Sequence, residues 1–280
     1  MQAKAFSDDG APNWRLLGPA SNRIHRHVLQ AIKDKPFMKS LPLDGLDSLT
    51  ISIYADGADL DTIRSRRKDN WVKGFTTNPT LMRRAGIRDY EAFCREAIAL
   101  TGELPISFEV FADDLAEMER QARLVASWGS NVYVKIPVST TLGEPTVKLT
   151  RSLSEDGIHL NVTALMTVDQ VEQVAESLQG GADSIVSVFA GRVADTGRDP
   201  ILLMKQCLER LMIAKNARLL WASPREILNL LQANEIGCDI ITMTDDLLSK
   251  VPLLGKDLRG YSLETVEMFR RDAIASGFEL

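Results

Sequence analysis

A lysine lies in the middle of a hydrophobic segment, V-Y-V-K-I-P-V, at positions 132–138. The segment is typical of a strand buried on both faces, where a lysine is rare unless its charge is compensated. Burial favours the neutral amine, which is a nucleophile that can form a Schiff base with a carbonyl compound. The segment alone leaves two roles open for Lys135: covalent catalysis, or a structural ion pair or strand-end position for its head group.

Polar residues also occur late in other strand-like segments. Taken singly, each can be a turn former, a helix cap or a satisfied core group. Together they bring two carboxylates and several hydroxyl and amide groups toward the amine, and each such group costs desolvation. A functional site therefore explains them better than packing does. The residues are Asp56, Thr76, Thr77, Asn78, Glu109, Asn161, Thr163, Ser187 and Ser223.

The elements that must position these residues follow a regular rhythm. Strand-like segments alternate with segments of helical pattern from about residue 49 onward. The predicted strands are Thr50–Ala55, Gly74–Thr77, Ile106–Val110, Val132–Val138, His159–Leu165, Ser184–Ala190, Arg218–Ala222 and Asp239–Met243. The predicted helices are Asp59–Arg67, Tyr90–Thr101, Asp114–Trp128, Pro145–Asp156, Val168–Gln179, Pro200–Asn216, Pro224–Asn234 and Asp245–Val251.

This alternation predicts a parallel sheet, and its simplest closure is a (β/α)8 barrel over residues 49–280. A doubly wound open sheet is the alternative, but no G-x-G-x-x-G follows the first strand. In a barrel, the polar residues listed above gather at one mouth. A further helix is expected at Ser262–Ala275, and residues 1–48 form an N-terminal extension with a helix at Pro19–Lys33.

Composition narrows the class of protein. The net charge of −5 and the pI near 5.4 argue against a general affinity for nucleic acid or for an anionic membrane surface. The three cysteines have neither disulfide-frame nor zinc spacing, and no apolar run is long enough for a membrane span. We expect a cytoplasmic protein. Because no metal-ligand spacing accompanies the lysine and the carboxylates, iminium chemistry is favoured over a metal-stabilised enolate.

At the second predicted strand the chain reads G-F-T-T-N-P-T-L-M, from Gly74 to Met82. This TTNP-[ST] signature resembles that of the transaldolase family, which includes the fructose-6-phosphate aldolases. The resemblance continues in order from about Ile51 to Met243. It is carried by Ile53–Asp56, Phe108–Val110, Val134–Pro137, Asn161–Thr163, Ser187–Arg192 and Ala222–Arg225.

The resemblance implies roles for individual residues. Lys135 is the Schiff-base lysine, Asp56 an acid/base, and Glu109 an acid/base that acts through a water positioned by Thr163. The substrate is a sugar phosphate, and no cofactor or metal is implied. The start of the helix after Ser223 is expected to add donors for the phosphate. The implied substrate-binding residues are Thr77, Asn78, Asn161, Ser187 and Phe189, together with Arg192, Ser223 and Arg225 for the phosphate.

The expected activity is transfer of a dihydroxyacetone unit from a ketose phosphate to an aldose phosphate, as in the pentose phosphate pathway. The alternatives are an aldolase that releases free dihydroxyacetone and a relative that acts on another sugar. Glu109 favours transfer, because the aldolase branch of the family that this chain resembles has glutamine at this position. A third hypothesis is a barrel that binds sugar phosphates without catalysing a reaction. Such a protein is expected to have lost Lys135, Asp56 or Glu109, and all three are present.

The chain departs from the family pattern at three places. Residues 1–47 have no counterpart, and residues 138–146 lack the S-x-x-G-I pattern that is common after the lysine strand. Residues 244–260 are also unfamiliar. These segments leave the identity of the sugars open, and the sequence leaves the formation of a homo-oligomer open as well.

Overall fold

The computed structural model describes residues 45–277. The helix predicted at Pro19–Lys33 lies outside the described residues, as does most of the N-terminal extension. The last residues of that extension, Gly45–Ser48, form the 3-10 turn η2. The described residues all belong to one compact unit.

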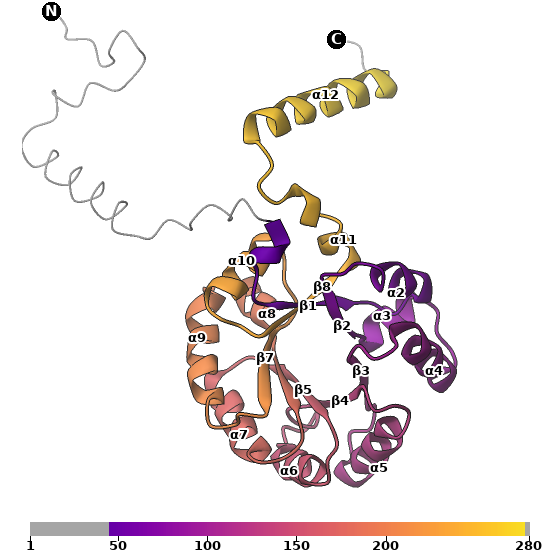
Figure 1. Cartoon of the computed structure of the whole chain (residues 1–280), viewed down its shortest axis with the longest axis vertical. Coiled ribbons are helices and arrows are strands. Elements are labelled where there is room, and N and C mark those ends of the chain that lie inside the picture. Colours follow the sequence, from indigo (N-terminus) through magenta and orange to yellow (C-terminus); the bar gives the residue numbers. More distant parts are fainter. Residues whose placement is uncertain (1–44, 278–280) are drawn as a thin grey trace, which may run out of the picture. The chain divides into compact units, whose positions relative to one another are not determined.

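Eight parallel strands close into a barrel in which each strand pairs with its neighbours along the chain and β8 pairs with β1 (Figure 1). The predicted (β/α)8 barrel is therefore confirmed, and the open-sheet alternative is excluded. The strands are β1 (Ser52–Asp56), β2 (Val72–Thr76), β3 (Ile106–Glu109), β4 (Val132–Pro137), β5 (Leu160–Leu165), β6 (Ser184–Val188), β7 (Ala217–Trp221) and β8 (Ile240–Thr244).

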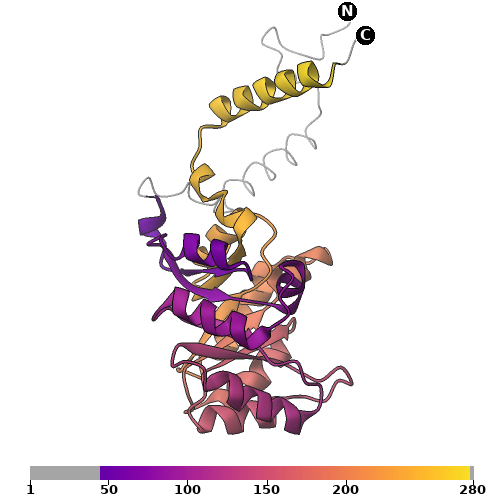
Figure 2. The ribbon, with the colours of Figure 1, turned by 90° about the vertical axis from the view of Figure 1, so that its right-hand side faces the viewer.

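Helices follow the strands and lie outside the barrel, as the side view in Figure 2 also shows. None of the residues of the final helix is buried. The helices are α2 (Leu60–Arg66), α3 (Pro79–Arg84), α4 (Tyr90–Thr101), α5 (Leu115–Ala126), α6 (Val147–Glu155), α7 (Val168–Leu178), α8 (Ala190–Asp195), α9 (Pro200–Leu211), α10 (Leu228–Glu235), α11 (Asp245–Leu248), the 3-10 turn η3 (Val251–Leu253) and α12 (Leu258–Ser276).

Side-chain caps fix the starts of several of these helices. The side chains of Asp59, Asp89, Asp114, Thr167 and Asp199 each accept a hydrogen bond from a backbone N–H in the first turn. These N–H groups have no partner within the helix, so each cap stabilises the point at which the strand-to-helix loop ends. The loops that carry the site are thereby anchored at their far ends.

The structure corrects the predicted boundaries at two site loops. The strand predicted to run to Ala190 ends at Val188, and the unpredicted short helix α8 begins at Ala190. The helix predicted from Pro224 begins at Leu228. The helix begins later in the chain because Asn229 Oδ1 accepts hydrogen bonds from the backbone N–H groups of Arg225 (2.7 Å) and Glu226 (3.2 Å). These bonds hold the segment before α10 in a loop.

The barrel interior contains a small hydrophobic cluster, separate from the large core between strands and helices. Tyr54, Tyr133, Ile185 and Ile240 belong to it. Each lies two residues before a polar residue of the same strand, so both side chains point to the same face of the strand. The interior is thus apolar in one layer and polar in the next layer toward the carboxyl ends of the strands.

Candidate active site

A cavity of about 970 Å³ opens at the carboxyl ends of the barrel strands. It brings together residues from all eight strands and from the loops that follow them. Among the predicted site residues, only Thr77 does not line it. Those that do are Asp56, Thr76, Asn78, Glu109, Lys135, Asn161, Thr163, Ser187, Phe189, Arg192, Ser223 and Arg225.

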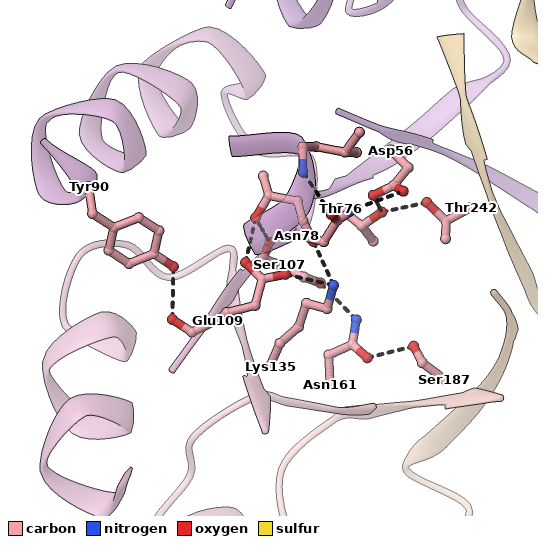
Figure 3. Close-up of polar contacts among 12 residues, drawn as sticks. Asp56, Thr76, Asn78, Tyr90, Ser107, Glu109, Lys135, Asn161, Ser187 and Thr242 are labelled. Atoms are coloured by element: carbon pink, nitrogen blue, oxygen red, sulfur yellow. Dashed lines mark hydrogen bonds and ion pairs between the residues drawn. The ribbon is translucent and has the colours of Figure 1, made fainter. Parts of the chain in front are cut away.

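Lys135 lies in this cavity with Glu109 beside it, on the adjacent strand (Figure 3). The Lys135 Nζ atom lies 2.7 Å from Glu109 Oε1 and donates a hydrogen bond to the carbonyl oxygen of Thr77 at 2.6 Å. The two side chains are only 10% and 7% exposed, respectively. The pair therefore compensates the buried charge of Lys135, while the cavity gives a ligand access to its amine.

Thr77 supports this pair from behind. Its hydroxyl lies 2.9 Å from both Glu109 Oε2 and the carbonyl oxygen of Ser107. Its side chain is fully buried and does not line the cavity. The structure therefore places Thr77 behind Glu109, and its predicted contact with substrate stays a prediction.

Asp56, at the end of β1, is held by two donors. Thr76 Oγ1 donates to Asp56 Oδ1 at 2.8 Å, and Asn78 Nδ2 donates to Oδ2 at 3.2 Å. Asn78 is itself fixed as the N-cap of α3, because its Oδ1 accepts the backbone N–H of Leu81. Burial raises the pKa of Asp56, and the Lys135 charge and both hydrogen bonds act in the opposite direction. A carboxyl with a raised pKa is suited to accept and return a proton.

A second chain of hydrogen bonds crosses the floor of the cavity. Ser187 Oγ donates to Asn161 Oδ1 at 2.6 Å, and Asn161 Nδ2 donates to Ser107 Oγ at 3.0 Å (Figure 3). Thr163 Oγ1, by contrast, is a buried atom without a hydrogen-bond partner among the described residues. Since Thr163 lines the cavity, its hydroxyl is free to bind a water or a ligand atom.

Two arginines gather at the β6 and β7 side of the cavity. Arg192 lies over the Phe189 ring, 5.4 Å from its centroid. Arg225 donates from Nε to Asp195 Oδ1 at 2.9 Å, pairs through Nη2 with the other oxygen, and donates from Nη1 to Ser223 Oγ at 2.9 Å. The hydrogen bonds and charge of Arg225 and the charge of Arg192 hold the pKa of Asp195 below its ordinary value. The arginines can bind an anion with fork-shaped charge.

The backbone at this arginine cluster is tightly packed. Ser223 has a φ of 61°, in the left-handed region that a serine rarely adopts. A Cβ added at Gly191 would overlap the carbonyl oxygen of Ser223. Gly191 thus permits the close approach of α8 to the loop after β7. The start of α10, which was expected to add donors, does not line the cavity.

The cavity also contains residues that the sequence did not single out. Thr242 on β8, Asp195 on α8, Asp246 on α11 and Arg84 on α3 all line it. For Thr242 a signal was present, since it alternates with Ile240 along a strand and so faces the interior. Asp195 lies three residues after Arg192. This spacing places both residues on one side of a helix, but the sequence did not predict the helix α8 that contains them.

A model of the transaldolase/fructose-6-phosphate aldolase family matches residues 53–278 of the chain. The chain belongs to this family. Among its relatives, a probable transaldolase of Dehalococcoides mccartyi is 35% identical over 203 residues, which cover 71% of this chain and 89% of that protein. A probable transaldolase 2 of Listeria monocytogenes is 32% identical over 216 residues, which cover 75% of this chain and 94% of that one. The family predicted from the TTNP-type signature is confirmed.

Solved structures of distant sequence share the fold. A putative lyase/mutase from Burkholderia cenocepacia has a TM-score of 0.52 at 15% identity and covers 81% of this chain and 87% of its own. A mandelate oxidase mutant has the same TM-score at 13% identity and covers 80% and 81%. At this identity the likeness supports the barrel fold alone.

Two further observations concern the described residues as a whole. Between residues 45 and 277, no group of three or more histidine, cysteine, aspartate or glutamate side chains is arranged to hold a metal ion. No helix in the same range is long and apolar enough to cross a membrane. In the segment that departs from the family pattern, Ser139 and Pro145 form an isolated bridge, and Leu142 between them is 93% exposed.

Proposed function

We propose that this member of the family is a transaldolase that transfers a dihydroxyacetone unit from a ketose phosphate to an aldose phosphate through a Schiff base on Lys135. One observation carries the proposal. The Lys135 amine, held by Glu109 and by the Thr77 carbonyl, lines the same cavity as two arginines on other strands. A phosphate bound by the arginines leaves the rest of a sugar within the cavity that the amine lines. The relatives' names, probable transaldolase, agree with this activity.

The first stage is formation of the Schiff base. Lys135 first passes a proton from its ammonium group to Glu109, and the resulting neutral amine attacks the ketone carbon of the donor sugar and gives a carbinolamine. The carbinolamine oxygen takes up a proton and leaves as water, and a protonated Schiff base remains. Glu109 lies beside the amine, and Thr163 has the free hydroxyl, so we assign the proton transfers to Glu109 through a water bound at Thr163.

The second stage is cleavage of the adjacent carbon–carbon bond. Asp56 takes the proton from the hydroxyl of the carbon that becomes an aldehyde, the bond breaks, and its electron pair moves to the iminium nitrogen to give an enamine. The aldose phosphate leaves, an acceptor aldose phosphate enters, and the enamine attacks its aldehyde carbon. Asp56 returns the proton to the new hydroxyl, and water releases the product from Lys135. The raised pKa of Asp56 suits both directions of this transfer.

The remaining polar residues bind the substrate in this proposal. Asn78, Asn161 and Ser187 orient the hydroxyls of the three-carbon unit, since all three are held by hydrogen bonds and line the cavity. Arg192 and Arg225 bind the phosphate. Ser223 lies against Arg225 and adds a hydroxyl to the same end.

Borohydride trapping tests the covalent step. The protein is incubated with fructose 6-phosphate, reduced with borohydride and digested, and the peptides are analysed by mass spectrometry. We expect an adduct on Lys135 and none in the Lys135→Ala variant, which loses turnover. Trapping on another lysine, or turnover in that variant, contradicts the mechanism.

Activity with and without erythrose 4-phosphate separates the two reactions of the family. A transaldolase converts fructose 6-phosphate rapidly only when the acceptor is present. Release of free dihydroxyacetone at an equal rate without the acceptor assigns the protein to the aldolase reaction and overturns the transfer proposal.

A further inference from the structure

Three side chains from three strands form a chain of hydrogen bonds that ends on Asp56. Thr76 Oγ1 on β2 lies 2.8 Å from Asp56 Oδ1 on β1 and 2.5 Å from Thr242 Oγ1 on β8. Figure 3 shows the Thr76 hydroxyl between its two partners, the Asp56 carboxylate and the Thr242 hydroxyl. Thr76 and Thr242 are 2% and 7% exposed, so little water competes for these contacts.

The number of hydroxyl protons fixes the direction of this chain. Each threonine hydroxyl has one proton and two lone pairs. An ionised Asp56 can only accept, so the proton of Thr76 points to Asp56, and the contact between the threonines requires Thr242 as the donor. A hydroxyl that accepts one hydrogen bond donates a stronger one, because the bonds polarise each other.

We propose that Thr242 is a positioning residue of the acid/base machinery, which acts through Thr76 to hold the Asp56 carboxylate ionised and in place. The inference rests on the proposed role of Asp56 as the base in carbon–carbon cleavage. Thr242 differs from Thr76 in that it does not touch Asp56. Its effect on Asp56 is therefore transmitted by the Thr76 hydroxyl.

Other charged groups also act on Asp56. The Lys135 charge on β4 favours the ionised carboxylate, and the Glu109 charge on β3 disfavours it. On the β8 side, Asp246 of α11 lines the same cavity, and its carboxylate accepts the hydroxyl proton of Thr244. None of these groups changes when Thr242 is replaced, so a shift in the titration of the base can be assigned to the hydroxyl chain.

The test is the pH dependence of kcat/KM for wild type, Thr242→Val, Thr76→Val and the double variant. The acidic limb reports a base that must be ionised in the free enzyme. Thr76→Val removes the hydrogen bond that Asp56 accepts directly. This change is expected to move the acidic limb to higher pH by about one unit, which is the usual strength of a hydrogen bond to a charged group. Thr242→Val moves the limb to higher pH by about 0.3 units, because it removes only the part of that hydrogen bond's strength that Thr242 adds by polarising Thr76. The double variant matches Thr76→Val, because Thr242 has no route to Asp56 without Thr76.

Two control variants distinguish an effect of the Thr242 hydroxyl on Asp56 from an effect of side-chain packing around Thr242. Thr242→Ser restores the hydroxyl and returns the limb to the wild-type position, whereas a purely structural methyl contact would not be restored. Thr244→Val, two residues further along β8, leaves the limb in place. If Thr242→Val does not fold, Thr242→Ala removes the same hydroxyl with less bulk and carries the test.

The outcomes distinguish this inference from the proposed function. If wild type forms no borohydride adduct on Lys135, the proposed function fails. If wild type is trapped on Lys135 but Thr242→Val leaves the limb unmoved, or the effects of the two valine substitutions add, only the role of Thr242 is overturned.

Discussion

Replacing Lys135 with methionine tests the buried ion pair directly. Methionine keeps an unbranched, apolar side chain of similar length and removes the amine, so turnover is lost. The Glu109 carboxylate, whose side chain is 7% exposed, then faces a thioether in place of a cation 2.7 Å away. It keeps the hydroxyl of Thr77, 2.9 Å from Oε2.

The expected cost follows from breaking a buried pair on one side only. Such changes cost about 3–5 kcal/mol, because the remaining charge is left without compensation. The lower end, about 3 kcal/mol, is expected here, since Thr77 still donates to Glu109 and the cavity admits water. For a barrel of this size that corresponds to a decrease in Tm of roughly 6–12 °C.

The assay is urea unfolding followed by circular dichroism at pH 8. The matched variant Lys135→Met/Glu109→Gln removes both charges and keeps the shapes, so its free energy of unfolding returns to within about 1 kcal/mol of wild type. Full stability of the single variant at pH 8, or no recovery in the double variant, refutes the reasoning, because either result means that the pair does not hold a buried charge.

Three other outcomes are expected. Gly191→Ala raises KM for phosphorylated donors at least about tenfold and affects unphosphorylated donors less, because the new methyl group must displace the Ser223 carbonyl beside the two arginines. Steady-state kinetics with both kinds of donor measure this, and equal effects on the two contradict it. Gly74→Ala lowers stability by about 1–3 kcal/mol in thermal unfolding, since its Cβ would lie 2.5 Å from Tyr54 Cζ in the barrel interior. The pKa of Asp56 is raised from 3.8, so wild type loses stability as the pH rises from that value through the raised pKa. The free energy of unfolding of Asp56→Asn minus that of wild type therefore grows between pH 4 and pH 8, and a constant difference would falsify this assignment.

Much of the fold could be predicted from the sequence, because alternation of strand and helix patterns is a local property. The lysine strand illustrates this, since five of its six residues are buried as its composition predicts. The short helices α3 and α8 were not predicted, because six residues are too few to show a helical period. The late start of α10 depends on one side chain, Asn229, that captures two backbone N–H groups.

The candidate site could be predicted where polar residues lie late in predicted strands, as with Lys135 and Asp56, because closure of a barrel brings the strand ends together. It could not be predicted where the role depends on partners distant in the chain. Thr242 and Thr76 are 166 residues apart in sequence, and only closure of the barrel brings their hydroxyls together. The place of Thr77 behind the cavity wall could not be predicted either, because it depends on contacts of its hydroxyl with Glu109 and with the Ser107 carbonyl on the next strand.

The pairing of β8 with β1 also has a consequence for biosynthesis. Asp56 is among the first barrel residues to leave the ribosome, and Thr242 is among the last. A nascent chain that stops before Ile240 leaves both β1 and β7 with an open edge, which is exposed to pairing with other chains. Lys135 and Glu109 are already on neighbouring strands by then, but the hydrogen-bond chain from Asp56 through Thr76 still lacks Thr242. In this protein the final strand therefore both closes the two open edges of the barrel and completes the hydrogen-bond chain that ends on Asp56.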